Sequence, residues 1–400
     1  MGGVLAGRID GTALRIGVIG AGFIGAVHAH AARRAGARVV GAVASSATNT
    51  EGAVQRLGAE RGFESGEALA GSSDIDVVHI CTPNHLHRPL AEAAIAAGKH
   101  VICEKPLAVT GDEAEALRAA ADRAGVVATV PFVYRFYPMV REARARLADD
   151  VGPVRLVHGA YLQDWLSTDD DDNWRVDAEL AGASRAFADI GSHWCDLVEF
   201  VTGDRLSSVC AELVTVLPER VHGENVHAFE AAGDGEGTRR AVTTEDVAVV
   251  VFRTERGVTG SVVVSQISSG RKNQLRFEIS GAGATLAFDQ EEPDTLWVGH
   301  RGPSEVVARD PARLHASAAA YVTVPPGHPQ GYQECFDAFA ADSYRAIAVG
   351  SSDAIDGLPT FADGARAARV TDAVLRSAEG HRWEDVVVDD RAPASGQESP

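Results

Sequence analysis

The chain has 400 residues, more than one hydrophobic core usually supports, so two domains are expected. Its composition, 45% hydrophobic and 23% charged, is that of a globular protein and excludes a disordered or fibrous chain. The formal net charge of −19 disfavours phosphate backbones and anionic lipid surfaces, so we expect neither nucleic acid nor membrane as a partner.

The five cysteines are scattered and include no Cys-x-x-Cys pair, which predicts reduced thiols in the core rather than a zinc or redox site. Residues 1–13 are rich in glycine and lack the apolar run of a signal peptide. No apolar stretch approaches the roughly 20 residues that a membrane helix requires. These features predict a cytoplasmic protein with a flexible segment at 1–13.

Residues 14–137 alternate short β-branched runs with Ala-rich stretches of helical period. Such alternation is typical of a parallel sheet with helices on both faces. The strands are expected at 15–19, 38–44, 76–81, 100–103 and 126–131, and the helices at 26–35, 50–61, 86–97 and 112–125. This half is therefore predicted to be a Rossmann domain, an α/β fold with a doubly wound parallel sheet.

Residues 138–390 change character, with a helix at 138–147 followed by longer strands that alternate apolar and polar residues. The strands are expected at 155–163, 207–216, 246–252, 258–265 and 275–280, with a hairpin turn at 254–257. Late helices at 331–349 and 361–378 are expected to pack on them. We predict a C-terminal α/β domain with a large, mainly antiparallel open sheet whose outer face is available to a partner subunit, and a disordered tail at 391–400.

The first predicted strand leads into Gly-x-Gly-x-x-Gly, a dinucleotide-binding pattern. Gly20 permits a tight turn, Gly22 lets the backbone approach a pyrophosphate, and Gly25 lets the helix pack closely on the strand. Phe23 and Ile24 open that helix, whose free N–H groups favour phosphate. A flexible loop is the alternative, but the strand and helix on either side favour the nucleotide site.

The end of the second strand bears on the choice of nucleotide. A Rossmann domain that prefers NAD offers a carboxylate to the ribose there, whereas this chain has Ser45 and Ser46. The missing carboxylate removes a repulsion toward a 2′-phosphate, yet no arginine follows to attract one. The cofactor is therefore predicted to be NAD or NADP.

Polar residues follow the third and fourth strands, at the sheet edge where open α/β folds bind ligands. The third-strand loop carries Thr82, Pro83, Asn84 and His87, and the fourth strand ends in Glu104-Lys105-Pro106. Oxidation of an alcohol by hydride transfer needs a base beside the nicotinamide, and a lysine at this edge is suitably placed. The alternative for Lys105 is a solvated surface charge.

In the second half, Asp189 and His193 are four residues apart at the start of a predicted helix and share one face of it. A carboxylate beside an imidazole suits a proton shuttle. The alternative is an N-cap aspartate with a buried structural histidine.

Together these motifs resemble the family of glucose–fructose oxidoreductase, inositol dehydrogenase and MocA, from Leu14 to about Val388. The resemblance rests on the glycine motif with His28, on Thr82-Pro83-Asn84 with His87, and on 97–106, which is the most specific match. It also covers Asp189-Ile190-Gly191-Ser192-His193, Gly331-Tyr332 and 359–364. Two departures are Ser45 in place of the acid and Ala181-Gly182-Ala183-Ser184-Arg185 where many relatives have a Gly-rich stretch.

The resemblance implies a substrate cleft between the two domains and an open sheet that forms the contact between subunits. It implies that Lys105, Asp189 and His193 are catalytic and bind substrate, that Glu104 and Asn84 lie near the nicotinamide ribose, and that the Lys105–Pro106 bond is cis. It also places Trp174 and Arg175 near cofactor or substrate.

Other residues are predicted on weaker grounds. Tyr134 and Arg135 follow the last Rossmann strand, where substrate binding and domain packing are equally compatible with the pattern. Substrate contacts are also expected among Ser265, Gln266, His328 and Tyr332. The aspartate run 169–172 suits a solvated loop better than a metal site, and no metal is predicted.

The sequence thus favours an NAD(P)-dependent oxidoreductase that moves a hydride between nicotinamide and a secondary hydroxyl or keto group of a sugar, sugar derivative or cyclitol. Two alternatives remain: a redox-neutral enzyme that cleaves glycosides with a tightly bound NAD, and a non-catalytic sugar or nucleotide sensor. Whether Lys105 or His193 is the immediate base stays open. A homo-oligomer, dimer or tetramer, is expected through the C-terminal sheet.

Overall fold

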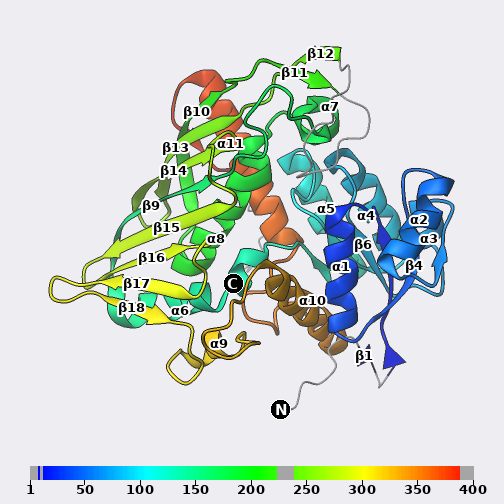
Figure 1. Cartoon of the computed structure of the whole chain (residues 1–400), viewed down its shortest axis with the longest axis horizontal. Helices are drawn as coiled ribbons and strands as arrows, with labels where there is room; N and C mark the ends of the chain where they lie inside the picture. The colour runs from blue at the N-terminus through cyan, green and yellow to red at the C-terminus, as the bar shows by residue number, and fades with distance from the viewer. Residues whose placement is uncertain (1–7, 10–11, 223–237, 388–400) are drawn as a thin grey trace, which may run out of the picture.

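The computed structural model describes residues 8–9, 12–222 and 238–387, which form two sheets with helices between and around them (Figure 1). The predicted disordered tail 391–400 lies outside these residues. Part of the segment predicted to be flexible is hydrogen-bonded, because β1 (Arg8–Ile9) pairs with β2 (Thr12–Ala13). In the described part of the chain, no helix combines the length and apolar character that crossing a bilayer requires.

The N-terminal sheet has six parallel strands in the order β5-β4-β3-β6-β7-β8, which confirms the doubly wound prediction. Its strands are β3 (Arg15–Ile19), β4 (Arg38–Val43), β5 (Arg61–Gly62), β6 (Val77–Ile80), β7 (His100–Cys103) and β8 (Ala128–Thr129). Its helices are α1 (Phe23–Arg34), α2 (Ala47–Leu57), α3 (Gly66–Ala70), α4 (His87–Ala96) and α5 (Gly111–Ala124). The sequence did not predict β5 and α3, because both are too short for a periodic pattern.

The second sheet has nine strands in the order β18-β17-β16-β15-β9-β14-β13-β10-β19. All neighbours are antiparallel except β9 and β14, which run parallel. Its strands are β9 (Val154–Leu162), β10 (Leu206–Val214), β13 (Val247–Thr254), β14 (Thr259–Ser265), β15 (Gln274–Gly281), β16 (Thr285–Asp289), β17 (Thr295–Gly299), β18 (Glu305–Ala308) and β19 (Glu384–Asp385). A separate ribbon pairs β11 (Glu219–His222) with β12 (Thr238–Ala241). The sequence missed β16–β18, which extend the sheet beyond β15.

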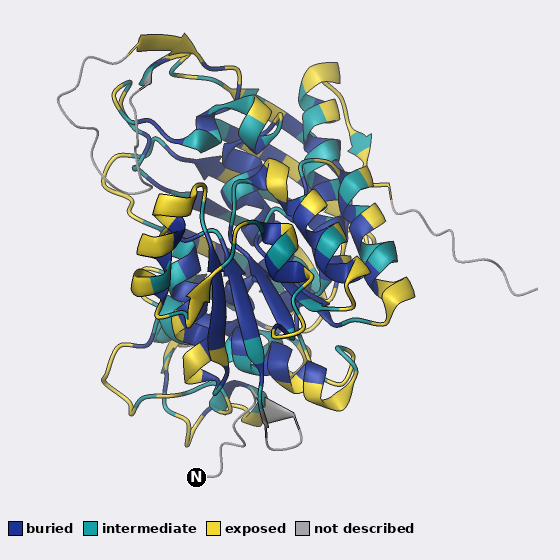
Figure 2. Cartoon of the chain, turned by 90° about the vertical axis from the view of Figure 1, so that its right-hand side faces the viewer, coloured by how far each residue is buried: buried dark blue, intermediate teal, exposed yellow. Residues whose placement is uncertain are grey.

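Helices cover one face of this sheet. They include α6 (Pro138–Arg146), α8 (Ser192–Thr202) and α11 (Phe361–Gly380), all of which contact its strands. Residues of β13 alternate between this buried face and an exposed one. Because Val249 and Val251 lie on the exposed face, β13 is apolar on both faces and does not show the predicted alternation of apolar and polar residues. The parallel strands of the first sheet are instead buried along most of their length (Figure 2).

The last two long helices join the two halves. α10 (Tyr332–Val349) packs on α1 of the Rossmann domain, and α11 lies between α5 and β10. The expectation that both pack on the second sheet is therefore wrong for α10, because its apolar face is buried against the first domain. Short helices α7 (Ala178–Ala181) and α9 (Ala316–Ala319) complete the second half.

A buried ion-pair cluster ties the end of the Rossmann domain to α8 and α11. Arg135, in a helical turn at Val133–Phe136, donates Nε to Asp196 Oδ2 at 2.8 Å and Nη2 to Asp363 Oδ1 at 2.8 Å. Its guanidinium also pairs with Asp196 Oδ1. Because Arg135 and Asp196 are both buried, each charge depends on the other for compensation.

We predict that Arg135→Met lowers the free energy of unfolding by about 3–5 kcal/mol, because it leaves the buried carboxyl of Asp196 and that of Asp363 without their shared partner. Urea unfolding monitored by circular dichroism measures this change. The control Arg118→Ala removes surface pairs on α5 with Glu115 and Asp122, and we expect a cost of less than about 1 kcal/mol. If both variants lowered the free energy of unfolding by the same amount, the cluster would not stabilise the contact between the halves.

Candidate active site

The glycine loop between β3 and α1 has the backbone of a pyrophosphate cradle. Gly20 has a φ of +97°, and a Cβ there would lie 2.4 Å from the Cys81 carbonyl oxygen. A Cβ on Gly25 would lie 2.1 Å from the Gly20 carbonyl oxygen, so the protein itself requires these two glycines. A Cβ on Gly22 would meet no described atom within 4 Å. The open space at Gly22 fits a ligand that approaches the backbone, as a dinucleotide does.

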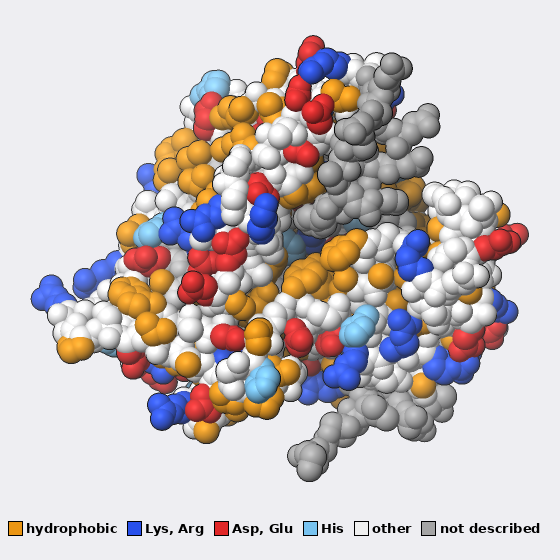
Figure 3. All heavy atoms as spheres, in the orientation of Figure 1, with side chains coloured by type: hydrophobic (Ala, Val, Ile, Leu, Met, Phe, Trp, Pro, Cys, Tyr) orange, Lys and Arg blue, Asp and Glu red, His pale blue; other side chains and the backbone are white. Residues whose placement is uncertain are grey.

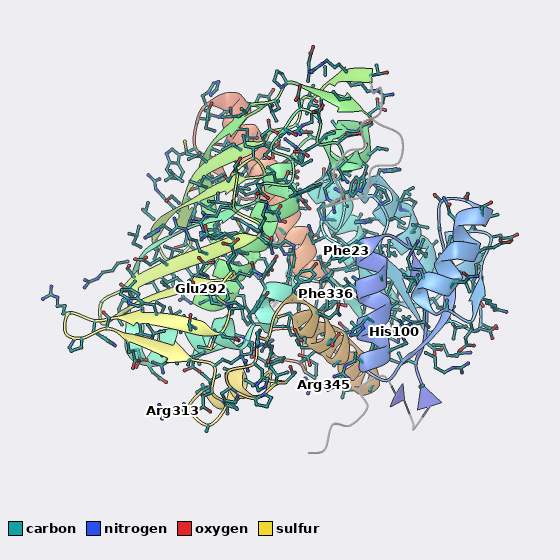
Figure 4. The ribbon with its side chains drawn as sticks, in the orientation of Figure 1. Phe23, His100, Glu292, Arg313, Phe336 and Arg345 are labelled. Atoms are coloured by element: carbon teal, nitrogen blue, oxygen red, sulfur yellow. The ribbon has the colours of Figure 1, made fainter. Side chains whose placement is uncertain are left out.

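The helix that follows begins without a side-chain cap at Gly22 and carries no acidic residue in its first turn. Both features favour a bound phosphate there. Phe23 is 57% exposed and lies at the end of α1 that borders the space between the two halves (Figure 4), while Ile24 is half-buried.

The loop after β4 keeps its serines at the surface. Ser46 caps α2 by accepting from the Asn49 backbone N–H at 3.2 Å, and Asn49 Nδ2 donates to Ser45 Oγ at 2.9 Å. The loop therefore offers hydroxyl groups to an adenosine ribose, without a carboxylate or a guanidinium.

The third-strand loop is fixed by hydrogen bonds. Asn84 donates Nδ2 to the Ala181 carbonyl at 2.8 Å, which joins this loop to the second half. Both ring nitrogens of His87 face carbonyl oxygens, of Pro106 at 2.8 Å and of Thr82 at 2.9 Å, so His87 holds the loop rather than offering a free nitrogen to a ligand. The Thr82 hydroxyl is buried and has no hydrogen-bond partner in the described part of the chain. It is a donor or acceptor left for a cofactor.

Lys105 meets Asp189 across the boundary between the halves. Lys105 follows β7 with a cis bond to Pro106, as the resemblance implies, and its Nζ donates to Asp189 Oδ1 at 2.7 Å and to the Asp189 carbonyl oxygen at 2.9 Å. Asp189 belongs to a π-helical turn, Phe187–Gly191, that runs into α8. The alternative of a solvated lysine is therefore excluded.

Two further side chains bind Asp189. Gln266, just after β14, donates Nε2 to Asp189 Oδ2 at 2.8 Å, and Arg175 Nε lies 3.4 Å from Oδ1. Burial by itself would raise the pKa of Asp189, but the charges of Lys105 and Arg175 outweigh it and hold that pKa well below its usual range. Asp189 is therefore an anion at any physiological pH.

His193 is buried beside this carboxylate. Its ring packs edge-on against Tyr134, with centroids 5.0 Å apart, and against Phe132, with centroids 5.6 Å apart. Burial first, and then the positive charge of Lys105, lower the pKa of His193 well below its ordinary value. His193 is therefore neutral at neutral pH and able to exchange a hydrogen bond with a substrate hydroxyl.

Sequence analysis missed a polar cluster on the second sheet. Tyr161 hydrogen-bonds through its hydroxyl to Tyr134 and to Asn273 Oδ1, the latter at 2.8 Å, and Gln163 Nε2 reaches the same oxygen at 2.8 Å. Trp165 donates Nε1 to Gln163 Oε1 at 2.8 Å. The signal was present as polar residues at the carboxyl end of a strand, but only the fold brings β9 and β15 to the site.

The other residues that were predicted for the site lie in different surroundings. Tyr332 begins α10, and its pKa is raised by burial and by neighbouring Tyr134, Glu104 and Asp189, so it lies with the site residues. Trp174 packs on the Arg175 guanidinium, 4.5 Å from ring centroid to Cζ. Arg135 has the domain-packing role that its position also allowed, because the buried cluster described above occupies its guanidinium. The His328 carbonyl oxygen accepts from Arg309, and its side chain is exposed. Ser265 accepts from Ile267 N–H and from Ser268 Oγ.

The described residues thus bring together a dinucleotide cradle and a buried Lys-Asp-His group contributed by both halves of the chain. The space-filling view shows the surface hollowed between these halves (Figure 3). Such an arrangement defines a nicotinamide-dependent oxidoreductase with an interdomain site.

Comparisons with known proteins agree with this class. Residues 14–132 match the model of the Gfo/Idh/MocA oxidoreductase family with an NAD-binding Rossmann fold, and residues 140–287 match the C-terminal domain model of that family. Levoglucosan dehydrogenase of Pseudarthrobacter phenanthrenivorans is 34% identical over 93% of this chain and 98% of its own. Inositol 2-dehydrogenase of Rhizobium meliloti is 26% identical over 91% of this chain and 96% of its own.

Solved structures give the same result. An oxidoreductase domain protein from Kribbella flavida has a TM-score of 0.84 and 35% identity, with 94% of this chain and 99% of that one covered. A levoglucosan dehydrogenase in complex with NADH and levoglucosan has a TM-score of 0.84 and 32% identity, with the same coverage. The chain belongs to the Gfo/Idh/MocA family, and it is an NAD(P)-dependent oxidoreductase acting on CH–OH groups of sugars or related polyols.

We predict that Gly22→Ala leaves the melting temperature within about 1 °C of wild type but weakens NADH binding at least about 10-fold, because the added methyl group occupies ligand space and touches no protein atom. Fluorescence titration of NADH and thermal unfolding measure the two effects. The matched variant Gly25→Ala should lose stability instead, since its methyl group clashes with the Gly20 carbonyl. Unchanged NADH affinity in Gly22→Ala would remove Gly22 from the cofactor site.

Proposed function

We propose that this enzyme oxidises a secondary hydroxyl of an uncharged sugar, anhydrosugar or cyclitol, and reduces the matching ketone in reverse. In this proposal residues 14–137 hold the cofactor and residues 138–390 hold the substrate. The observation that carries it is the meeting of Lys105, from the cofactor half, with Asp189 and His193, from the other half.

Lys105 is the proton carrier in this proposal. Bound nicotinamide would accept or supply the hydride, and Thr82, Glu104 and the glycine loop are the groups that would hold it. Lys105 takes the hydroxyl proton in oxidation, and Asp189 stabilises the ammonium that results.

His193 orients the hydroxyl. It is neutral, buried and held between the rings of Phe132 and Tyr134, which restrict its rotation. A fixed imidazole next to Lys105 keeps the reacting oxygen within reach of the lysine without adding a second positive charge. His193 is thus a substrate ligand, and Lys105 is the immediate base.

The charges at the site favour an uncharged substrate. Among the described residues, Lys105 and Arg175 face Asp189, and Arg185, which lines the same pocket, pairs with Asp246. Each of these cations thus already has a carboxylate partner within the protein. Hydroxyl groups of a substrate suit the Gln266 Oε1, which has no hydrogen-bond partner among the described residues, and the phenol of Tyr332 at the start of α10. The similarity to levoglucosan dehydrogenase, a structure of which holds NADH and levoglucosan, supports anhydrosugars as the first class to test.

We expect Lys105→Met to lower kcat/KM about 100-fold to 10,000-fold, the range for loss of a general base, while NADH still binds. NAD(P)H absorbance is followed across anhydrosugars, aldoses, inositols, uronic acids and sugar phosphates, with NAD and NADP tested separately. Lys272→Met, which removes a side chain that is 80% exposed, is the control and should match wild type.

Activity only on the charged sugars would reject the substrate class. Turnover of a glycoside without net change in NADH absorbance would instead identify the redox-neutral reaction, and absence of any turnover with NADH bound would favour a sensor.

We further infer that a second copy of the chain covers the exposed face of the nine-stranded sheet. This face carries outward apolar side chains on adjacent strands: Leu156, Val214, Val249, Val251 and Val263. Apolar side chains gather over these strands in Figure 3. An exposed apolar sheet face of this kind is usually covered by a partner.

The cytoplasmic location stays a prediction.

Light scattering tests the assembly. We expect wild type at a multiple of 42.0 kDa, and the double variant Val251→Asp/Val263→Asp at 42.0 kDa because two carboxylates would have to be buried in the interface. Because Val251 and Val263 are exposed in the single chain, the double variant should keep its fold, as measured by circular dichroism. A wild-type protein that runs only as a 42.0 kDa species would refute the inference.

A further inference from the structure

A chain of buried hydrogen bonds runs from α10 through the Rossmann domain to the residue before the catalytic lysine. Tyr344 OH lies 3.0 Å from His79 Nε2, His79 Nδ1 lies 3.0 Å from His28 Nδ1, and His28 Nε2 lies 3.0 Å from Glu104 Oε1. Glu104 Oε2 accepts the Lys105 backbone N–H at 3.1 Å. All four residues are at most 6% exposed. No step of the proposed reaction uses His28, His79 or Tyr344.

The four side chains come from different parts of the fold. His28 lies on α1, His79 on β6, Glu104 just after β7, and Tyr344 on α10 of the second half. Phe336, two turns before Tyr344 on α10, packs on the His28 ring with centroids 5.2 Å apart. Figure 4 shows Phe336 between α10 and α1. The line of hydrogen bonds therefore passes through the contact between the two halves.

The hydrogen bonds have one consistent direction. A Glu104 carboxylate has no proton, so His28 must donate from Nε2, and the neutral ring then accepts at Nδ1 from His79 Nδ1–H. His79 in turn accepts at Nε2 from the Tyr344 hydroxyl. The reverse direction would need a protonated Glu104, and a doubly protonated His28 would leave the Tyr344 hydrogen without an acceptor among the described contacts. A phenol at one end and a carboxylate at the other thus fix both histidine tautomers.

We propose that His28, His79 and Tyr344 are positioning residues that keep Glu104 ionised and hold its carboxylate on the Lys105 amide. The packing of α10 on the Rossmann domain then determines the placement of the lysine. This proposal rests on the function proposed above for Lys105.

The charges around Glu104 agree with this role. Burial would raise the pKa of Glu104, but the hydrogen bond from His28, together with the charge and backbone N–H of Lys105, lowers it, and the pKa is lowered overall. Burial lowers the pKa of His79 well below its ordinary value and raises that of Tyr344, so both stay neutral. The other titratable groups coupled to Glu104 are Cys81, Cys103, His87 and Tyr332.

The first experiment needs no substrate. His28→Leu removes the donor to Glu104 and should allow the buried carboxyl to take up a proton near neutral pH. Infrared difference spectroscopy between pH 8 and pH 6 would then show a protonated-carboxyl band that wild type lacks. The band should be absent from the double variant His28→Leu/Glu104→Gln. Absence of the band from His28→Leu itself would overturn the proposal, whatever the enzyme's substrate.

The second experiment separates positioning from stability. Tyr344→Phe should lower kcat about 10-fold and His28→Leu about 100-fold, with KM for the sugar changed less than about 2-fold, because small displacements of a catalytic group act on the chemical step. His28→Gln, whose amide can donate to Glu104, should recover part of the lost kcat.

Ser343→Ala is the matched control. Ser343 precedes Tyr344 on α10 and links that helix to Thr129 of β8 through a contact of 3.1 Å between their hydroxyl oxygens. Both residues are fully buried, but neither belongs to the line of hydrogen bonds from Tyr344 to Glu104. The kcat of Ser343→Ala should equal that of wild type. Equal losses of kcat in Ser343→Ala and Tyr344→Phe would show that only packing matters and would refute the positioning role. Failure of the proposed function would appear differently, as a wild-type enzyme without turnover but with the infrared band intact in His28→Leu.

Discussion

The ion pair between Lys105 and Asp189 is the contact on which the site depends. It joins the carboxyl end of a Rossmann strand to the π-helical turn that leads into α8, at 2.7 Å, in a place from which water is largely excluded. A buried charge needs a partner, so neither residue is stable there alone. The same pairing that permits burial also sets the chemistry, because the Asp189 anion stabilises the lysine in its protonated form.

Other interactions hold the two sides of this pair in place. Glu104 fixes the backbone of Lys105, while Gln266 and Arg175 fix the carboxylate of Asp189. The Arg135 cluster and the packing of α10 and α11 join the halves around the site. Precision at the reacting atoms therefore comes from contacts between domains rather than from either domain alone.

Much of the first domain could be predicted because its signals are local. The strands at 15–19 and 100–103 have the predicted bounds, and Gly20 and Gly25 are required by backbone geometry that the motif encodes. Lys105, Asp189 and His193 were found from short motifs that combine a suitable residue type with a strand end or helix start. The second sheet was less predictable. Its strands β16–β18 are short, and the contribution of Gln163 and Asn273 depends on which strands become neighbours.

The sequence by itself determined that this chain has a dinucleotide-binding domain and a second, mainly antiparallel sheet, and it placed Lys105, Asp189 and His193 at a strand end and a helix start. It could do so because periodicity and glycine geometry act over a few residues. Only the tertiary structure decided that Arg135 is a structural ion-pair residue, that α10 belongs against α1, and that His28, His79, Glu104 and Tyr344 share one line of hydrogen bonds. The hydrogen-bonded partners among these residues lie from 51 to 265 positions apart, and no local pattern records a contact whose energy is set by packing and burial.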